Sequence, residues 1–310
     1  MSVHKSWLDA RGTIHTGPSF GAVGEFEVIE CEHCRFKHVV PIPTPAELLE
    51  TYSHEYYSSE KPLYIERYLE DKDWWELVYG ARYEMLEQHL DQSRRRILDV
   101  GAGPGLFLLT GRARGWQVKG VEPSRQAAAY SRDTLGLDVS EVFLDKDSAS
   151  SLGRFDAINM SLVLEHLPDP SGMLAMAHGL LSEGGLICIV APNDFNPFQL
   201  ALRDHVGIEP WWIAPPHHLN YFNFSSLGEL LDRNGFSPVH REATFPIDMF
   251  LLMGKNYIGN DDMGRECHRQ RMMFEMNLAR AGRSDLQRNL YAKIAEMGLG
   301  REIVIFARKL

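Results

Sequence analysis

The chain has 310 residues, of which 44% are hydrophobic and 24% are charged, a composition typical of a globular protein with a packed core. Its formal net charge of −10 argues against a nucleic-acid partner, which normally requires a basic surface. Four cysteines are too few for a disulfide framework, and without a leader segment or membrane-spanning run we expect a cytoplasmic protein with no membrane partner.

The first two regions differ in their residue patterns. Residues 1–60 are predicted to be irregular, because glycine, proline and histidine are scattered through them without a regular period. Residues 61–93 form a predicted helical lead-in, since apolar side chains recur at helical spacing from about Tyr64 to Leu90.

Residues 94–245 alternate short apolar runs with helical patterns, which indicates a parallel sheet covered by helices on both faces. We predict strands at residues 97–100, 117–121, 138–143, 155–160, 186–190 and 237–243. Sheets of this kind bind ligands at the carboxyl ends of their strands.

Residues 246–300 are predicted to be a helical insertion, with helices over 261–282 and 284–297. The second helix has Ser284 as its expected N-cap, Gln287 in a capping box and Gly298 just beyond its end. Residues 301–310 read as one last strand. The predicted fold class is therefore α/β, a Rossmann-like sheet with a helical insertion before the last strand.

The stretch "ILDVGAGPG" predicts a strand, a glycine turn and a helix, with glycines at 101, 103 and 105. A dinucleotide fingerprint places its third glycine or alanine one residue later, where this chain has Leu106. Asp99, next to the turn, would repel a pyrophosphate and suits an ammonium group. Glu122 ends the next strand, where an acid binds a ribose diol. These features favour S-adenosylmethionine over NAD.

Residues 96–236 resemble a class I S-adenosylmethionine-dependent methyltransferase. The resemblance rests on "ILDVGAGPG", "VEPS", "FDAINMSLVLEHLPDP" and "LLSEGGLICIVAPN", which occur in the family's order. It implies a seven-stranded sheet whose last strand is inserted antiparallel.

The resemblance also implies roles for cofactor-binding residues. Asp99 and Gly101 would contact the methionine part, Gly103 and Gly105 would allow close backbone approach, and Glu122 would bind the ribose. Asp145 lies where the family contacts the adenine, with a solvated loop acid as the alternative.

Three histidines are candidate catalytic bases, because histidine titrates near neutral pH. His166 follows the fourth strand in "LEHLPDP", where the family's Glu-His pair is often structural. His218 and His217 lie in "PPHHLNYF", which resembles a segment of sugar and natural-product methyltransferases that faces the substrate. We expect His218 to be the base, with His217 and then His166 as alternatives. Trp211 and Trp212 either wall the pocket or belong to the core.

"VIECEHCRFKHVVPIPT" resembles the second half of a zinc ribbon that precedes this domain in some nucleotide-sugar C-methyltransferases. Cys31 and Cys34 would supply two of the four zinc ligands, with His15, His33 and His38 as candidates for the others. The alternative is a ribbon that has lost its metal and kept its shape.

The predicted function is S-adenosylmethionine-dependent methyl transfer to a small polar acceptor, such as a sugar, a sugar conjugate or a natural-product intermediate. Oxygen or nitrogen is favoured over carbon, because "PPHH" lacks the tyrosine and glutamate of the C-methyltransferases that it resembles. A nucleotide-sugar C-methyltransferase and a non-catalytic adenosyl-binding scaffold are the alternatives, and the oligomeric state stays open.

The insertion is expected to cap the pocket. Four of its basic side chains either recognise a phosphate or carboxylate, or form a solvated helix face. These side chains are Arg265, His268, Arg269 and Arg271.

Overall fold

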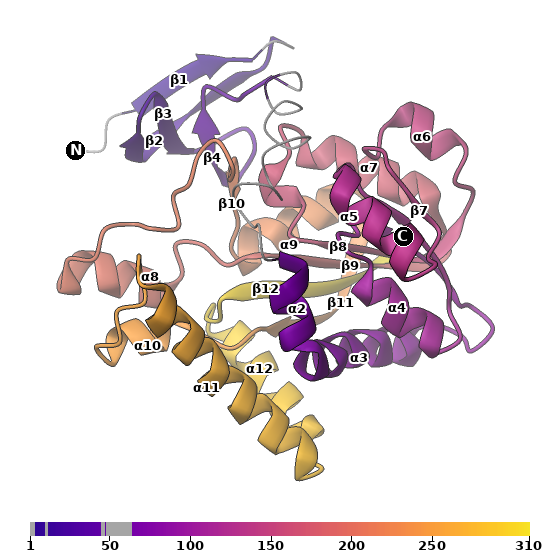
Figure 1. Cartoon of the computed structure of the whole chain (residues 1–310). Helices are drawn as coiled ribbons and strands as arrows, with labels where there is room; N and C mark the ends of the chain where they lie inside the picture. The colour runs from indigo at the N-terminus through magenta and orange to yellow at the C-terminus, as the bar shows by residue number, and fades with distance from the viewer. Residues whose placement is uncertain (1–3, 10–11, 45–46, 48–63) are drawn as a thin grey trace.

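A computed structural model describes residues 4–9, 12–44, 47 and 64–310 of the chain (Figure 1). These residues form a five-stranded antiparallel sheet that contains the N-terminal strands and a seven-stranded mixed sheet flanked by helices. The predicted boundary between the first two regions falls in residues 48–63, outside the described residues.

The seven-stranded sheet has the order β11-β12-β9-β8-β5-β6-β7. Its strands are β5 (Arg96–Val100), β6 (Gln117–Val121), β7 (Val139–Ser140), β8 (Phe155–Ser161), β9 (Leu181–Pro192), β11 (Phe236–Ala243) and β12 (Glu302–Lys309). Strand β12 runs antiparallel to β9 and β11, whereas β5, β6, β7, β8 and β9 are parallel. The predicted α/β methyltransferase sheet with its antiparallel last strand is confirmed.

Both faces of this sheet are buried, which explains why its strands are nearly continuous apolar runs. Leu98 and Ile189 pack in one apolar cluster with residues of α7 (Pro170–Leu180) and α9 (Phe224–Arg233). Their neighbours Ile97 and Val190 pack on the other face, against α3 (Lys72–His89) and α4 (Leu106–Ala113). Alternation along each strand thus divides the core into two layers.

Several boundaries differ from the prediction. The strand expected at 138–143 is only β7, because residues 142–144 turn toward a cavity that they line. The lead-in helix is divided into α2 (Tyr64–Glu70) and α3, with the buried Asp71 between them. Further helical segments are α5 (Arg125–Ala129), η2 (Tyr130–Thr134), α6 (Lys146–Ser150), η3 (Leu164–His166), α8 (Pro197–Ala201) and η4 (Leu202–Val206).

The N-terminal region is not irregular, which corrects our expectation. It forms β1 (His4–Leu8), β2 (Ile14–Val23), β3 (Phe26–Glu30) and β4 (Lys37–Val40), which pair in that order. A two-residue turn at Gly24, with a φ of 60°, joins β2 to β3. The strands β1, β3 and β4 have five residues or fewer, and such short runs show little periodicity in the sequence.

The fifth strand of this sheet comes from the other part of the chain. Strand β10 (Asn220–Tyr221) pairs antiparallel with β4, so that Asn220 lies opposite His38. The Val39 amide donates to the Leu219 carbonyl at 2.9 Å and continues the connection. The segment that precedes α9 is therefore part of the N-terminal sheet.

The insertion is helical as predicted and contains α10 (Asp248–Leu252), α11 (Asp261–Arg280) and α12 (Ser284–Glu296). Helix α12 packs on β11, and α11 contacts α3 (Figure 1). Ser284 is the first helical residue rather than the N-cap, and Arg283 holds the cap position without a side-chain bond. Within the described ranges, no helix has the length and apolarity needed to cross a membrane.

Candidate functional site

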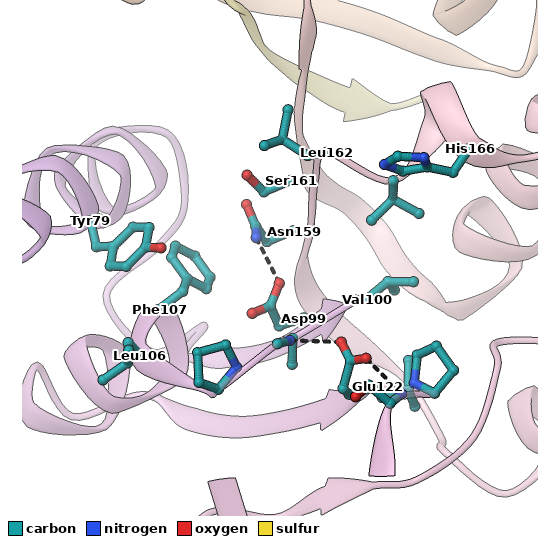
Figure 2. Close-up of a pocket in the computed structure, with 18 of the residues that line it drawn as sticks. Tyr79, Asp99, Val100, Leu106, Phe107, Glu122, Asn159, Ser161, Leu162 and His166 are labelled. Carbon is teal, nitrogen blue, oxygen red and sulfur yellow. Dashed lines mark hydrogen bonds between the residues drawn. The ribbon is translucent and has the colours of Figure 1, made fainter. Parts of the chain in front are cut away.

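A cavity of about 570 Å³ opens at the carboxyl ends of β5, β6 and β8. This volume lies in the range of small-molecule sites, about 300–1,000 Å³. Its walls come from the glycine turn after β5, the turn after β6, the loop after β8 and the helices α2, α3 and α11. Figure 2 shows Asp99, Glu122 and Asn159 at its polar floor.

The glycine turn requires glycine at two positions. Gly101 has a φ of 72°, and a Cβ there would lie 2.9 Å from Val163 Cγ2. Gly105 has a φ of 82°, and a Cβ there would lie 2.6 Å from Ser131 Oγ. Gly101 and Gly103 line the cavity, whereas Gly105 is the N-cap residue of α4 and does not.

Asp99 is buried at the end of β5 and accepts a hydrogen bond from Asn159 Nδ2 at 2.7 Å. Burial raises the pKa of the Asp99 carboxyl to about 7, while the Asn159 bond and the charge of Arg82 partly offset this effect. Arg82 on α3 is buried and lines the same cavity, with Nη1 3.4 Å from Ser161 Oγ. A carboxylate and a guanidinium in one cavity match the two charges of an amino-acid group.

Glu122 is held by two backbone amides at the end of β6. Its Oε2 accepts from the Gly103 amide at 2.8 Å, and its Oε1 accepts from the Ser124 amide at 2.8 Å. Burial raises the pKa of Glu122, and the two amide bonds counteract that rise. The carboxylate is thus fixed toward the cavity, where it is able to accept further hydrogen bonds.

The structure does not bring Asp145 into the cavity. Its carboxylate is exposed and caps α6, where it accepts from the Ser148 amide at 2.8 Å. The backbone bends before it, so Phe143 and Leu144 line the cavity instead. The side chains that line this part of the cavity are therefore apolar, whereas the sequence predicted the carboxylate of Asp145 there.

Of the three candidate bases, His166 lines the cavity, and His217 and His218 do not. Pairing of β10 with β4 draws the segment around His217 and His218 toward the N-terminal sheet. His218 packs behind His166, with ring centroids 5.1 Å apart. The expectation that His218 faces the pocket is corrected, because, of the three histidines, the cavity lining contains His166.

The orientation of His166 is fixed by two neighbours. Its Nδ1 lies 2.6 Å from the His217 carbonyl oxygen, and because a carbonyl only accepts, Nδ1 carries the proton. Its Nε2 lies 3.8 Å from an oxygen of the buried Glu165. The basic nitrogen of the neutral ring is therefore Nε2, with a carboxylate nearby to stabilise the protonated ring.

Sequence reasoning missed several residues of this cavity. Arg82 and Asn159 are not among the site residues that the sequence predicts. Each is a polar residue inside an apolar stretch, and that is the signal in the sequence that could have identified them. Tyr68 and Trp75 belong to the apolar pattern that predicts the lead-in helix, and both line the cavity. Trp211 and Trp212 pack instead with the cluster around Phe195 and Tyr221, as the core interpretation predicted.

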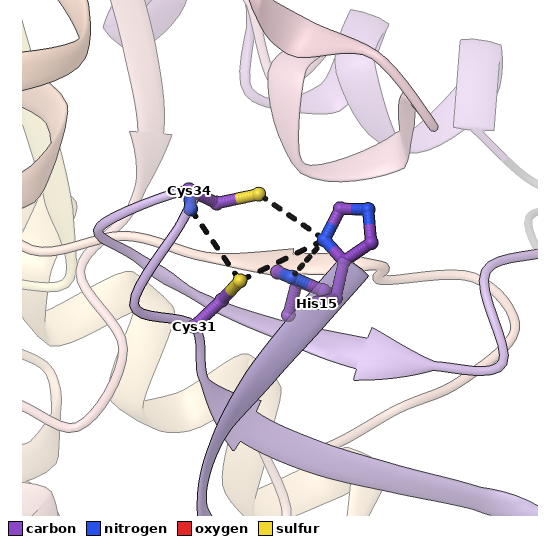
Figure 3. Close-up of side chains that lie close together, drawn as sticks. His15, Cys31 and Cys34 are labelled. Carbon is purple, nitrogen blue, oxygen red and sulfur yellow. Dashed lines mark hydrogen bonds between the residues drawn. The ribbon is translucent and has the colours of Figure 1, made fainter. Parts of the chain in front are cut away.

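A second polar cluster lies in the N-terminal sheet and is shown in Figure 3. It joins Cys31, Cys34, His15 and His38, whose candidate ligand atoms all lie within 4.8 Å of one another. His15 Nδ1 is 3.6 Å from Cys31 Sγ, 3.4 Å from Cys34 Sγ and 3.2 Å from His38 Nε2. His33, the other candidate, is exposed and outside the cluster.

The family model described as "Methyltransferase domain" matches residues 78–241, which is more than half of the chain. The chain belongs to this family. The match includes β5 to β9 and the polar floor of the cavity, and it confirms the class of S-adenosylmethionine-dependent methyltransferases that the motifs indicated.

Among curated proteins, a ubiquinone biosynthesis O-methyltransferase of Azotobacter vinelandii is 27% identical over 115 residues, covering 36% of this chain and 50% of that protein. The protein with the same description from Chromobacterium violaceum is 28% identical over 115 residues, with the same coverage of 36% and 50%. The chain therefore spans about half the length of the curated relatives that it matches.

Solved structures with a similar fold include a SAM-dependent methyltransferase from Archaeoglobus fulgidus. It has a TM-score of 0.49 and 18% identity, and the match covers 78% of this chain and 99% of that one. Magnesium protoporphyrin IX methyltransferase from Synechocystis PCC 6803 has a TM-score of 0.49 and 13% identity, with coverage of 82% and 97%.

Proposed function

We propose that the protein transfers a methyl group from S-adenosylmethionine to an oxygen or nitrogen of a small-molecule acceptor. The observation that carries the proposal is the set of Asp99, Arg82 and Glu122 in one cavity at the strand ends. Asp99 would accept from the ammonium group of the cofactor, Arg82 would bind its carboxylate, and Glu122 would accept from its ribose hydroxyls. Residues 142–144 would pack against the adenine.

When bound, S-adenosylmethionine supplies a methyl group that is already activated as a sulfonium. The protein then has to hold the acceptor in line and about 3–3.5 Å from that carbon, and to exclude water. The aromatic side chains that line the cavity serve to exclude water. For a hydroxyl acceptor, Nε2 of His166 takes the proton, and the Glu165 carboxylate stabilises the charged ring.

The curated relatives support oxygen as the acceptor atom, because they are named as O-methyltransferases. The sugar-like acceptor expected from the sequence stays a prediction, as does the cytoplasmic location. A non-catalytic adenosyl-binding scaffold is the alternative, and the cavity residue His166 favours the enzyme.

Calorimetry with S-adenosylhomocysteine and NAD tests the cofactor assignment. We expect S-adenosylhomocysteine to bind and NAD not to bind. Glu122→Ala should weaken S-adenosylhomocysteine binding about 5- to 150-fold, because the ribose hydroxyls lose a buried acceptor. The control is Glu141→Ala, an exposed acid outside the cavity lining. Tight NAD binding without S-adenosylhomocysteine binding would overturn the proposal.

We further propose that the cluster in the N-terminal sheet binds zinc through Cys31, Cys34, His15 and His38. Zn–S bonds of about 2.3 Å and Zn–N bonds of about 2.0–2.1 Å, arranged tetrahedrally, place ligand atoms about 3.3–3.8 Å apart. The three measured separations of 3.2, 3.4 and 3.6 Å agree with that geometry.

The outer ring nitrogens of both histidines also fit a metal site. His38 Nδ1 lies 2.8 Å from the Val39 carbonyl oxygen, and His15 Nε2 lies 3.5 Å from Asp9 Oδ2. Such acceptors fix the tautomer of a ligating histidine and direct its other nitrogen at the metal. The four side chains offer two thiolates and two imidazoles, a structural zinc set.

Elemental analysis of the purified protein tests the zinc site. We expect close to one equivalent of zinc, which Cys34→Ser should reduce severalfold and His33→Ala should leave unchanged. Less than a tenth of an equivalent after growth with added zinc would instead support the metal-free ribbon.

A further inference from the structure

The four basic side chains of α11 that the sequence singled out have different surroundings. Arg265 contacts Asp71 at 3.1 Å, and His268 contacts the same carboxylate at 3.2 Å. Arg269 contacts Glu266 at 2.7 Å and is exposed. Arg271 is the member of this group that lines the cavity. The structure therefore separates three side chains that pair with protein acids from one that faces the ligand space.

Arg271 is largely, though not fully, buried and is incompletely paired. Its side chain is only 11% exposed, and its nearest acid is Glu275, whose Oε1 lies 3.6 Å from Nε, beyond hydrogen-bond distance. Glu275 already accepts from Trp74 Nε1 and from the Tyr291 hydroxyl. Among the described residues, the Nε of Arg271 is buried without a hydrogen-bond partner.

A largely buried guanidinium with an unmatched Nε–H is costly unless a ligand supplies the acceptor. A planar guanidinium binds a carboxylate or phosphate through two parallel hydrogen bonds. The other cavity arginine, Arg82, lies beside Asp99 and is assigned to the cofactor carboxylate. Arg271 is then left for a second anion, which has to come from the acceptor.

The wall next to Arg271 is aromatic. Its guanidinium carbon lies 4.7 Å from the centre of the Trp74 ring, and Trp74 contacts Trp75 with centroids 4.5 Å apart. Trp75 in turn stacks on Tyr68 and Tyr79, each with centroids 5.2 Å away. These rings form a continuous surface along one side of the cavity. Such a surface suits a flat apolar body better than an extended polar one.

We infer that the acceptor carries an anionic oxygen group, bound by Arg271, on a flat ring that packs against the aromatic wall. This inference rests on the proposed methyl transfer, since it assigns the acceptor part of the same cavity. Among small polar acceptors, it selects flat molecules that carry a carboxylate or a phosphate group.

Calorimetry in the presence of saturating S-adenosylhomocysteine tests this inference with three probes. They are 3,4-dihydroxybenzoate, its uncharged amide 3,4-dihydroxybenzamide, and uridine diphosphate. Wild type should bind at least one of the two acids more than tenfold tighter than the amide. Whichever acid binds more tightly shows whether the site prefers a carboxylate or a phosphate.

Arg271→Gln should weaken that acid about 10- to 100-fold and leave the amide within twofold, because the lost bonds are made to the charged group. Arg271→Lys keeps the positive charge but loses the planar pair of donors. Its affinity for the acid should therefore lie between those of wild type and Arg271→Gln. Arg269→Gln, whose native side chain is 58% exposed, is the matched control and should change the affinity for neither probe.

Equal binding of acid and amide, binding of no probe, or equal losses for both in Arg271→Gln would overturn the inference. S-adenosylhomocysteine affinity is measured for every variant and should stay within twofold. If wild type fails to bind S-adenosylhomocysteine, the proposed function fails, whereas intact cofactor binding without a preference for acids removes the acceptor assignment alone.

Discussion

The cavity has two sides that are built in different ways. On the cofactor side, Asp99 and Glu122 follow directly from strand ends, and Glu122 is held by two backbone amides. On the proposed acceptor side, Arg271 comes from α11 and His166 from the short helical turn η3, which are far apart in the chain. A binding site fixed by backbone thus lies beside one that side-chain packing assembles. Substitutions on the two sides should therefore separate cofactor affinity from turnover.

The largest expected effect is on the acceptor side. His166→Ala should slow methyl transfer about 10²–10⁴-fold, the usual loss for a general base, while S-adenosylhomocysteine affinity stays within a few-fold. The measurement is S-adenosylhomocysteine formation with a saturating hydroxyl acceptor. His218→Ala, behind the ring, should cost less than tenfold. A larger loss in His218→Ala than in His166→Ala would show that the bases are assigned in the wrong order.

On the cofactor side, Asp99→Asn should reduce S-adenosylhomocysteine affinity about 10- to 150-fold, because a bond to a charged group is lost. The ligand-free variant should remain folded, since burial already favours the uncharged form of this carboxyl. Calorimetry gives the affinity, and circular dichroism gives the fold. Unchanged affinity in the folded variant would place the ammonium group elsewhere.

The raised pKa of Asp99 predicts a pH dependence that distinguishes the two sides. With a pKa of about 7, the carboxylate forms as pH rises, so cofactor affinity should increase roughly tenfold between pH 6 and 8. The ligand-free protein behaves oppositely: the stability from this raised pKa is present below about pH 4 and is lost as pH rises through 7. Titration of Asp99→Asn should show a flat affinity profile, and a profile equal to wild type would remove Asp99 as its source.

The smallest effect is expected at Asp145, which the structure removes from the cavity. Asp145→Ala should leave S-adenosylhomocysteine affinity within twofold and should lower stability by about 0.5–2 kcal/mol, the worth of a helix cap. Chemical denaturation gives the stability change. If affinity falls tenfold instead, the original adenine assignment is restored.

The sequence predicts that Asp99, Gly101 and Glu122 lie together at the strand ends, and the structure places them in one cavity, because local rules govern their positions. A strand followed by glycines with positive φ positions Asp99 and Gly101, and the next strand end positions Glu122. The same locality explains why the alternation of strands and helices predicts the seven-stranded sheet. Glycine spacing and hydrophobic period are properties of neighbouring residues, so they can be read without knowing the tertiary structure.

The acceptor side and the N-terminal sheet depend on contacts that neighbouring residues do not encode. The sequence placed His218 in the pocket because of its position in the chain, but pairing of β10 with β4 moves that segment away. It named His15 and His38 only as candidates among three histidines, because their distance to the cysteines depends on strand register. Arg271 was one of four basic candidates on α11, and its place in the cavity lining separates it from the others.

The small strand β10 has a practical consequence for anyone who shortens this protein. Asn220 lies opposite His38, and its side chain donates to the carbonyls of Leu164 and Leu167, on either side of His166. A truncation that begins after residue 44 would remove β4 and leave the backbone of β10 without its partner. The segment around His166, which is bonded to Asn220, would then lose the strand pairing that positions Asn220. Shortened versions of the protein should therefore keep the N-terminal sheet even when only the methyltransferase fold is wanted.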